Sequence, residues 1–165
     1  MVSPAHSKEE LFQLLSEIPD PEIPVVSIRE MGMLRDINIL DDGYEVVITP
    51  TYTGCPAMSM IESDIKSTLQ KHGISPVSVK LVYSPAWTTD WMSAEAKEKM
   101  RKYGIAPPMQ STCNKWSAVG KPVVISCPRC QSKHTHVISH FGSTACKALY
   151  FCESCKEPFE YFKCH

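Results

Sequence analysis

Cys127-Pro-Arg-Cys130 and Cys152-Glu-Ser-Cys155 are the two segments that decide the fold of the C-terminal part of this chain. Each is a Cys-x-x-Cys pair, in which the backbone turns back and brings two sulfurs to one metal ion at about 2.3 Å. Two such pairs complete a tetrahedron around the ion, and the 21 residues between them are easily looped. Val123-Val-Ile125 and Phe159-Glu-Tyr-Phe162 favour short strands beside the pairs. The pattern therefore predicts a β-rich, zinc-ribbon-like domain with four cysteine ligands.

The identity of the predicted metal is less strongly specified than the set of ligands. Zinc and iron–sulfur clusters both accept four thiolates, and we favour zinc. Four thiolates leave no open coordination position on zinc, so the ion would be structural rather than a Lewis acid in catalysis. Four free thiols or two labile disulfides are the alternative interpretation of the same four cysteines.

Cysteine usage also bears on the cellular compartment. The chain has 165 residues and 8 cysteines, and seven of these cysteines lie in the last 53 residues. The N-terminus lacks the basic and apolar regions of a signal peptide, and no run approaches the ~20 apolar residues that span a bilayer. We therefore expect a cytoplasmic protein, in which a dense cysteine cluster holds a metal rather than disulfides. The site leaves Cys113, Cys146 and Cys164 unexplained, and exposure on a strand explains His134 and His136 as well as ligation does.

Charge divides the chain into two parts. Residues 1–106 carry 10 basic and 15 acidic side chains, a net charge of −5, whereas residues 107–165 carry 7 and 3, a net charge of +4. This shift coincides with the Pro107-Pro108 pair and predicts a domain boundary there. The predicted parts are an iron–sulfur-assembly-like α/β domain over residues 8–105, a linker over 106–122 and the ribbon over 123–165. The overall net charge of −1 argues against a strongly basic nucleic-acid-binding protein.

Apolar periodicity predicts a mixture of helices and strands for the first part, and the fold class of the chain is therefore α+β. Ser7 and Glu10 form a capping box ahead of apolar residues spaced three and four apart, which predicts a helix ending at Pro19. Alternating residues on both sides of a turn at residues 41–43 predict a β-hairpin. The other expected elements are a helix with Pro56 in its first turn and Gly73 at its end, a third strand over 77–83, and a helix over 90–103 closed by Gly104.

Three places in the first part are candidate functional sites. Cys55 stands at a predicted helix start, where unpaired N–H groups and the helix dipole stabilise a thiolate, but spacing alone slightly favours a small buried residue. Asp20 and Glu22 are fixed by neighbouring prolines and are either metal-handling carboxylates or ordinary turn residues. Trp87 and Asp90 lie at the entry of the last predicted helix, where a tryptophan usually covers the edge of a core.

Four motifs of the first part occur in the order found in a known family. They are Asp20-Pro-Glu-Ile-Pro-Val25, Glu30-Met-Gly32, Thr51-Tyr-Thr-Gly-Cys-Pro56 and Ser84-Pro-Ala-Trp87-Thr-Thr-Asp90. This set resembles the SufT-like family of iron–sulfur cluster assembly factors. Its continuation into Phe141-Gly-Ser-Thr-Ala-Cys146 and the two cysteine pairs resembles the PaaD-type family, the D component of phenylacetyl-CoA 1,2-epoxidase. With that continuation the resemblance covers nearly the whole chain.

The resemblance implies an accessory or maturation role in aerobic phenylacetate degradation. Such a protein would help to assemble the iron–sulfur cluster of the reductase or the di-iron centre of the oxygenase, and these epoxidase components would be its partners. Cys55 would then be a transient ligand of iron or of a cluster, with Asp20, Glu22, Trp87 and Asp90 as supporting residues. Assembly into a homo-oligomer is left open.

The motifs that the sequence lacks agree with this implied role. We find no phosphate loop, no dinucleotide fingerprint, no Glu-x-x-His pair for di-iron and no nucleophile motif, so we expect no enzymatic activity of the chain by itself. The main alternative is a structural subunit that binds the oxygenase through its ribbon. A nucleic-acid-binding ribbon is a weaker third hypothesis, and we expect neither nucleic acid nor membrane as a partner.

Overall fold

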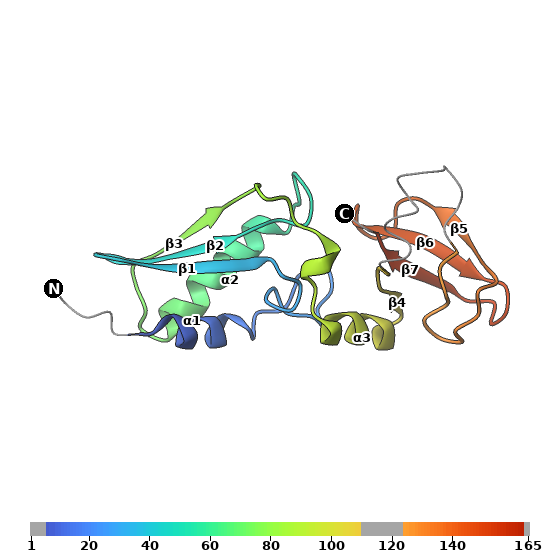
Figure 1. Cartoon of the computed structure of the whole chain (residues 1–165), viewed down its shortest axis with the longest axis horizontal. Coiled ribbons are helices and arrows are strands. Elements are labelled where there is room, and N and C mark those ends of the chain that lie inside the picture. The colour runs from blue at the N-terminus through green and yellow to red at the C-terminus, as the bar shows by residue number, and fades with distance from the viewer. Residues whose placement is uncertain (1–5, 110–123, 164–165) are drawn as a thin grey trace. The chain divides into compact units, whose positions relative to one another are not determined.

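The computed structural model of the chain describes residues 6–109 and 124–163 (Figure 1). Contacts between residues divide the chain into two compact units, Met1–Trp87 and Thr88–His165. Within the described residues, none of the helices has both the length and the apolar character needed to cross a membrane.

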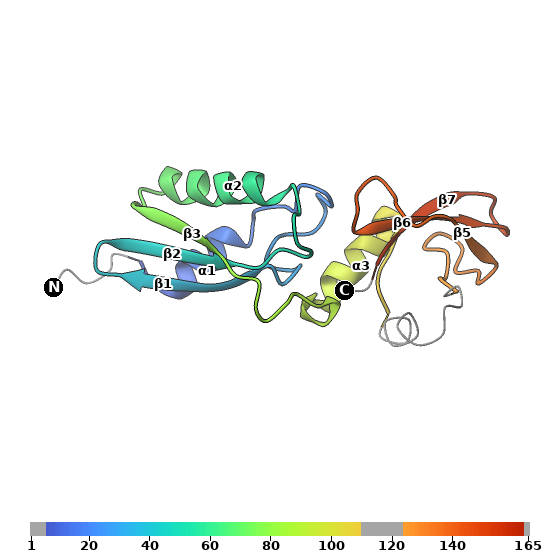
Figure 2. The same cartoon turned by 90° about the horizontal axis from the view of Figure 1, so that it is seen from above.

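The first unit is a three-stranded sheet with two helices (Figures 1 and 2). Its elements are α1 (Lys8–Leu15), β1 (Leu34–Leu40), β2 (Gly43–Ile48), α2 (Met58–Lys71) and β3 (Val77–Leu81). The strand order is β1-β2-β3; β1 and β2 form an antiparallel hairpin, and β2 pairs with β3 in parallel. The parallel pair needs a crossover connection, and α2 supplies it.

The core of this unit lies between one face of the sheet and the two helices. Ile37, Val46 and Val79 are opposite one another in the strand register and therefore point to the same face. α1 contacts β1 and α2, and α2 contacts β3, so both helices cover this face. The fully buried helical side chains recur at helical spacing and are Leu11, Leu15, Ile61, Ile65 and Leu69.

Several predicted local signals of this fold are confirmed. The Ser7 hydroxyl accepts the Glu10 N–H and the Glu10 carboxylate accepts the Ser7 N–H, which is the predicted capping box. Gly73 has a φ of +75° and Gly104 a φ of +99°, so both adopt the left-handed conformation that ends a helix. The β-hairpin also forms, with a register irregularity between Leu34 and Asp36.

Two predicted helix starts are wrong. The second helix begins at Met58, so Pro56 lies in the preceding turn rather than in the first helical turn. The last helix, α3 (Ala94–Tyr103), does not begin at residue 90, because the Ser93 hydroxyl accepts the Ala96 N–H and caps the helix there. Residues Thr89–Trp91 form a separate 3₁₀ turn, η1.

The second unit contains η1, α3 and a four-stranded sheet. The strands are β4 (Ile105–Ala106), β5 (Thr135–Ser139), β6 (Lys147–Cys152) and β7 (Pro158–Phe162), and their order is β4-β7-β6-β5. β5, β6 and β7 form an antiparallel meander, whereas β4 runs parallel to β7. The predicted limits of 8–105, 106–122 and 123–165 stay a prediction; the structure adds that Ile105 and Ala106, just before the two prolines, join the ribbon sheet.

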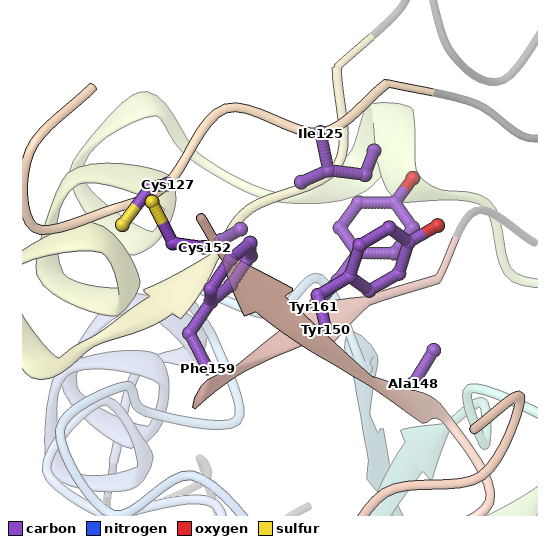
Figure 3. Close-up of a cluster of buried hydrophobic side chains, with 8 residues drawn as sticks. Ile125, Cys127, Ala148, Tyr150, Cys152, Phe159 and Tyr161 are labelled. Atoms are coloured by element: carbon purple, nitrogen blue, oxygen red, sulfur yellow. The ribbon is translucent and has the colours of Figure 1, made fainter. Parts of the chain in front are cut away.

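An aromatic cluster forms the core of the ribbon (Figure 3). Tyr150 stacks on Phe159 at a centroid distance of 5.8 Å and meets Tyr161 edge-on at 5.8 Å. Figure 3 shows the sulfurs of Cys127 and Cys152 side by side, next to Phe159. The ribbon core therefore continues directly into the cysteine cluster.

Candidate metal centre and the Cys55 region

Four cysteine sulfurs converge at one end of the ribbon sheet. Cys127, Cys130, Cys152 and Cys155 each offer one sulfur, and all four sulfurs lie within 4.8 Å of one another. The Cys127 and Cys155 sulfurs are 3.8 Å apart, and the Cys130 and Cys152 sulfurs are 3.5 Å apart. A disulfide would bring two sulfurs to about 2.05 Å, so these are free thiols grouped around a common point.

Each cysteine pair sits in the same backbone turn. The carbonyl of Cys127 accepts the Gln131 N–H at 2.9 Å, and the carbonyl of Cys152 accepts the Lys156 N–H at 2.9 Å. Gln131 and Lys156 follow the second cysteine of their pairs and have φ values of 61° and 59°. This left-handed conformation costs a residue other than glycine free energy, and its repetition in both turns shows that one turn geometry is built twice.

Hydrogen bonds and burial set the charges of these sulfurs. The backbone N–H groups of Cys155 and Ser154 donate to Cys152 and lower the pKa of its thiol to about 6. Burial, together with the neighbouring Cys152, raises the pKa of Cys155 to about 12. The site therefore offers a thiolate at neutral pH and would lose further protons on binding a cation.

The donor set fits a metal ion with tetrahedral preference. Four ligands at about 2.3 Å from one ion lie about 3.8 Å from each other at the corners of a tetrahedron. The observed separations of 3.5 and 3.8 Å are close to that value. Cys127 and Cys152 are fully buried, whereas Cys130 is exposed, so the site lies at the edge of the core.

The surplus cysteines and histidines lie away from this cluster where they are described. Cys146 is buried, and its sulfur lies 3.0 Å from the Thr144 hydroxyl. His134 and His136 are exposed, as expected for polar strand residues, and His136 lies 3.2 Å from a carboxylate oxygen of Glu153. The remaining two surplus cysteines, Cys113 and Cys164, lie outside the described residues.

Cys55 occupies the loop between β2 and α2 and is 8% exposed. Burial raises the pKa of its thiol, and the negative charges of Glu22 and Asp20 raise it further. The Ala57 N–H and the Tyr52 hydroxyl donate to the sulfur and lower the pKa, but burial dominates. The thiol at this position is therefore not the readily ionised group that a helix start would give, because α2 begins only at Met58.

Asp20 is the buried centre of the turn that carries Glu22. Its carboxylate accepts the N–H groups of Glu22 and Ile23, both at 2.8 Å, and its own N–H donates to the Val26 carbonyl at 2.7 Å. The turn thus places two carboxylates close enough to Cys55 to affect its pKa. The structure brings these three predicted residues together, and their role in metal handling stays a prediction.

Trp87 and Asp90 are placed differently from each other. Trp87 is 4% exposed, and its indole N–H donates to the Met31 carbonyl at 2.9 Å. Asp90 belongs to the exposed turn η1 in the second unit, where its N–H donates to the Thr88 hydroxyl. The contacts described for Trp87 are those of a core residue that fixes the segment around Met31.

Sequence reasoning missed a buried ion pair in the ribbon. Lys147 Nζ lies 3.0 Å from a carboxylate oxygen of Glu160, and only 4% of the lysine side chain is exposed. A signal for this pair is present in the sequence, because one charged residue interrupts each of two apolar segments that are expected to pair. The hydrogen bond from Tyr52 to Cys55 carries no comparable signal.

The geometry agrees with two known families. Residues 8–81 match the family "Iron-sulfur cluster assembly protein", and residues 111–163 match the "PaaD zinc beta ribbon domain". An Escherichia coli K12 protein provisionally named as a component of 1,2-phenylacetyl-CoA epoxidase, with the letter D, is 50% identical over 155 residues, which cover 94% of this chain and 92% of that protein. The chain belongs to this PaaD-type family.

Other relatives of this PaaD-type family member match its first part alone. A Porphyromonas gingivalis "Fe-S protein maturation auxiliary factor" is 32% identical over 92 residues, covering 54% of this chain and 87% of that protein. A crystal structure of a domain of unknown function, DUF59, from Bacillus anthracis superimposes with a TM-score of 0.51 and 29% identity, over 55% of this chain and 87% of that one. The predicted resemblance and the predicted α+β fold class are thereby confirmed.

Proposed function

We propose that this PaaD-type family member is a non-catalytic accessory protein of a phenylacetyl-CoA epoxidase system in phenylacetate degradation, and that it assists assembly of an iron–sulfur or di-iron centre. The observation that carries this proposal is the joining, in one chain, of an assembly-family domain with the ribbon of an epoxidase-component relative that is 50% identical. Its partners are the oxygenase or the reductase of that system. The free cysteines support the expected cytoplasmic location.

Cys55 is the proposed transient ligand of this assembly step. It lies within the matched residues 8–81, beside the carboxylates of Asp20 and Glu22. A thiol whose pKa is raised by burial and negative charge stays protonated until a cation arrives, and the same carboxylates attract that cation. Cys55 is therefore suited to take up iron or a cluster and to release it again.

The iron content of the client enzyme tests the proposal. The oxygenase and reductase are co-expressed with the natural chain, with Cys55→Ser and with Cys146→Ser, and the iron in each purified component is measured. Cys55→Ser is expected to lower the iron of one component, whereas Cys146→Ser, which replaces another buried cysteine outside the cluster, leaves it unchanged. Equal iron with Cys55→Ser and the natural chain would rule out the maturation function.

The four-cysteine centre is proposed to hold one structural zinc ion. A cluster with several irons bonds its thiolates to different iron atoms, which separates the sulfurs more than a single ion does. The separations of 3.5 and 3.8 Å favour the single ion, which would tie the two turns together. Elemental analysis should give one zinc per chain, and iron with acid-labile sulfide would contradict the assignment.

A structural component of the oxygenase is the second candidate, and the name of the E. coli relative as part of the epoxidase favours it. The two functions differ in what the assembled enzyme needs. If the chain co-purifies stoichiometrically with active oxygenase and its removal abolishes turnover, the structural function holds. A maturation protein is dispensable once the metal centre is complete.

A further inference from the structure

The loop between β5 and β6 exposes an aromatic ring. Phe141 is 67% exposed, the highest value among the large apolar side chains that the structure describes. Exposing a phenylalanine to water is unfavourable, and large apolar side chains at the surface often mark a site where another protein binds. Ile138, 52% exposed on the adjoining strand, adds to this apolar surface.

The loop that carries Phe141 is held in place by the buried ion pair. The Glu160 carboxylate accepts the Ser143 N–H at 2.6 Å while it pairs with Lys147. The Gly142 N–H donates to the Lys147 carbonyl at 2.7 Å, and a Cβ atom at Gly142 would lie 2.7 Å from the Glu160 oxygen. Because the loop is already ordered, presenting Phe141 to a partner costs little conformational entropy.

A cation accompanies the exposed ring. Lys163 Nζ lies 4.8 Å from the centre of the Phe141 ring and donates to the His140 carbonyl at 3.1 Å. No carboxylate in the described parts of the chain pairs with Lys163. The acidic residues of the ribbon are all engaged with other cations: Glu153 with Lys156, Glu157 with Arg129, and Glu160 with Lys147. The loop therefore presents an apolar ring beside an uncompensated positive charge.

We propose that Phe141 anchors the ribbon to an acidic surface of another protein of the epoxidase system, where the ring enters an apolar pocket and Lys163 faces a carboxylate. This inference rests on the proposed function, which supplies the class of partner. A protein suits the loop better than a nucleic acid does. The charge of +4 on residues 107–165 falls by 2 when four thiolates bind a divalent ion, which leaves little to neutralise phosphates.

Binding to the purified oxygenase and reductase tests the docking surface. Titration calorimetry is done with the metal-loaded natural chain, with Phe141→Ala and with Lys163→Glu. Phe141→Ala is expected to weaken binding to one component by about 30-fold or more, the effect of losing an interface anchor. Lys163→Glu is expected to weaken the same binding and to reduce its dependence on salt.

The matched control is Tyr103→Ala, which removes a similarly exposed aromatic ring (56%) from the end of α3. It should bind within about threefold of the natural chain, and all variants should keep their metal and near-ultraviolet circular dichroism. The docking surface is refuted if the natural chain binds neither component or if Phe141→Ala binds as tightly as the natural chain. Saturable binding to a single-stranded oligonucleotide that Phe141→Ala abolishes would refute it as well, in favour of a nucleic-acid partner.

Failure of the docking surface is distinguishable from failure of the proposed function. If Phe141→Ala weakens binding while Cys55→Ser leaves the client's iron unchanged, the docking surface stands and the maturation function fails. If Cys55→Ser lowers the iron while Phe141→Ala binds normally, the maturation function stands and this docking surface fails.

Discussion

Replacing Lys147 by methionine is expected to destabilise the ribbon, because the change leaves the Glu160 carboxylate without its cation. Removing one partner of a fully buried ion pair costs about 3 to 5 kcal/mol. Here the Glu160 side chain is 24% exposed and keeps the Ser143 N–H as a donor, so water and that hydrogen bond offset part of the loss. We therefore expect the free energy of unfolding of the second unit to fall by about 2 to 3 kcal/mol.

Urea unfolding of the metal-loaded protein, followed by the near-ultraviolet circular dichroism of the buried tyrosines, measures this change. Metal is held in excess, because binding to the folded state adds to the apparent stability. The matched control is the double variant Lys147→Met with Glu160→Gln. The amide oxygen of its glutamine can still accept the Ser143 N–H but carries no charge, so this variant should lie within about 1 kcal/mol of the natural chain.

The dependence of stability on pH provides an independent check. Burial alone would raise the pKa of Glu160, but hydrogen bonds from Ser143 and the charge of Lys147 lower it below its ordinary value of 4.5. A carboxylate with a lowered pKa in the folded state contributes stability above its unfolded pKa, and that contribution is lost as the pH falls through the folded value. Lys147→Met should therefore lose less stability on acidification below pH 4.5 than the natural chain does. A Lys147→Met variant as stable as the natural chain at neutral pH would refute the reasoning.

Three other predictions follow from described contacts. Cys152→Ala should lose the bound metal and the near-ultraviolet signal of the ribbon, because metal binding and folding are coupled in such sites; a variant that keeps one metal ion per chain would contradict the assigned ligands. Trp87→Phe should lower the unfolding free energy of the first unit by about 1 to 3 kcal/mol in urea, because the buried Met31 carbonyl loses its indole donor. Cys55 should react slowly with iodoacetamide at neutral pH and faster as the pH rises, because burial raises its pKa; rapid labelling at neutral pH, measured by mass spectrometry, would show that the thiol is ionised.

Elements whose signals are local could be predicted from the sequence. The Ser7 capping box, the left-handed glycines at 73 and 104 and the convergence of two Cys-x-x-Cys pairs each depend on residues a few positions apart. The start of α3 also has a local signal, but two candidates compete. Thr88 caps the short turn η1 and Ser93 caps the helix itself, so periodicity alone merges the two elements into one.

Features that depend on contacts distant in the sequence could not be predicted. The pairing of Ile105 with Glu160 joins residues more than 50 positions apart, and composition shows only the prolines that follow β4. The environment of Cys55 is likewise set by Asp20 and Glu22, which reach it through the fold rather than along the chain. The helix-start rule therefore predicts a lowered pKa for this thiol, while burial and two distant carboxylates raise it.

The two cysteine environments of this chain differ in the direction in which they shift a thiol pKa. At the ribbon site, backbone N–H donors lower the pKa of Cys152 to about 6, so a thiolate is present at neutral pH before any metal arrives. At Cys55, burial and the nearby carboxylates raise the pKa, so a metal must displace a proton before it binds. Because that displacement costs free energy at neutral pH, a divalent ion offered to the metal-free chain should fill the ribbon first. Metal handled at Cys55 would then be bound more weakly than the ribbon metal, as the proposed transfer to a client requires.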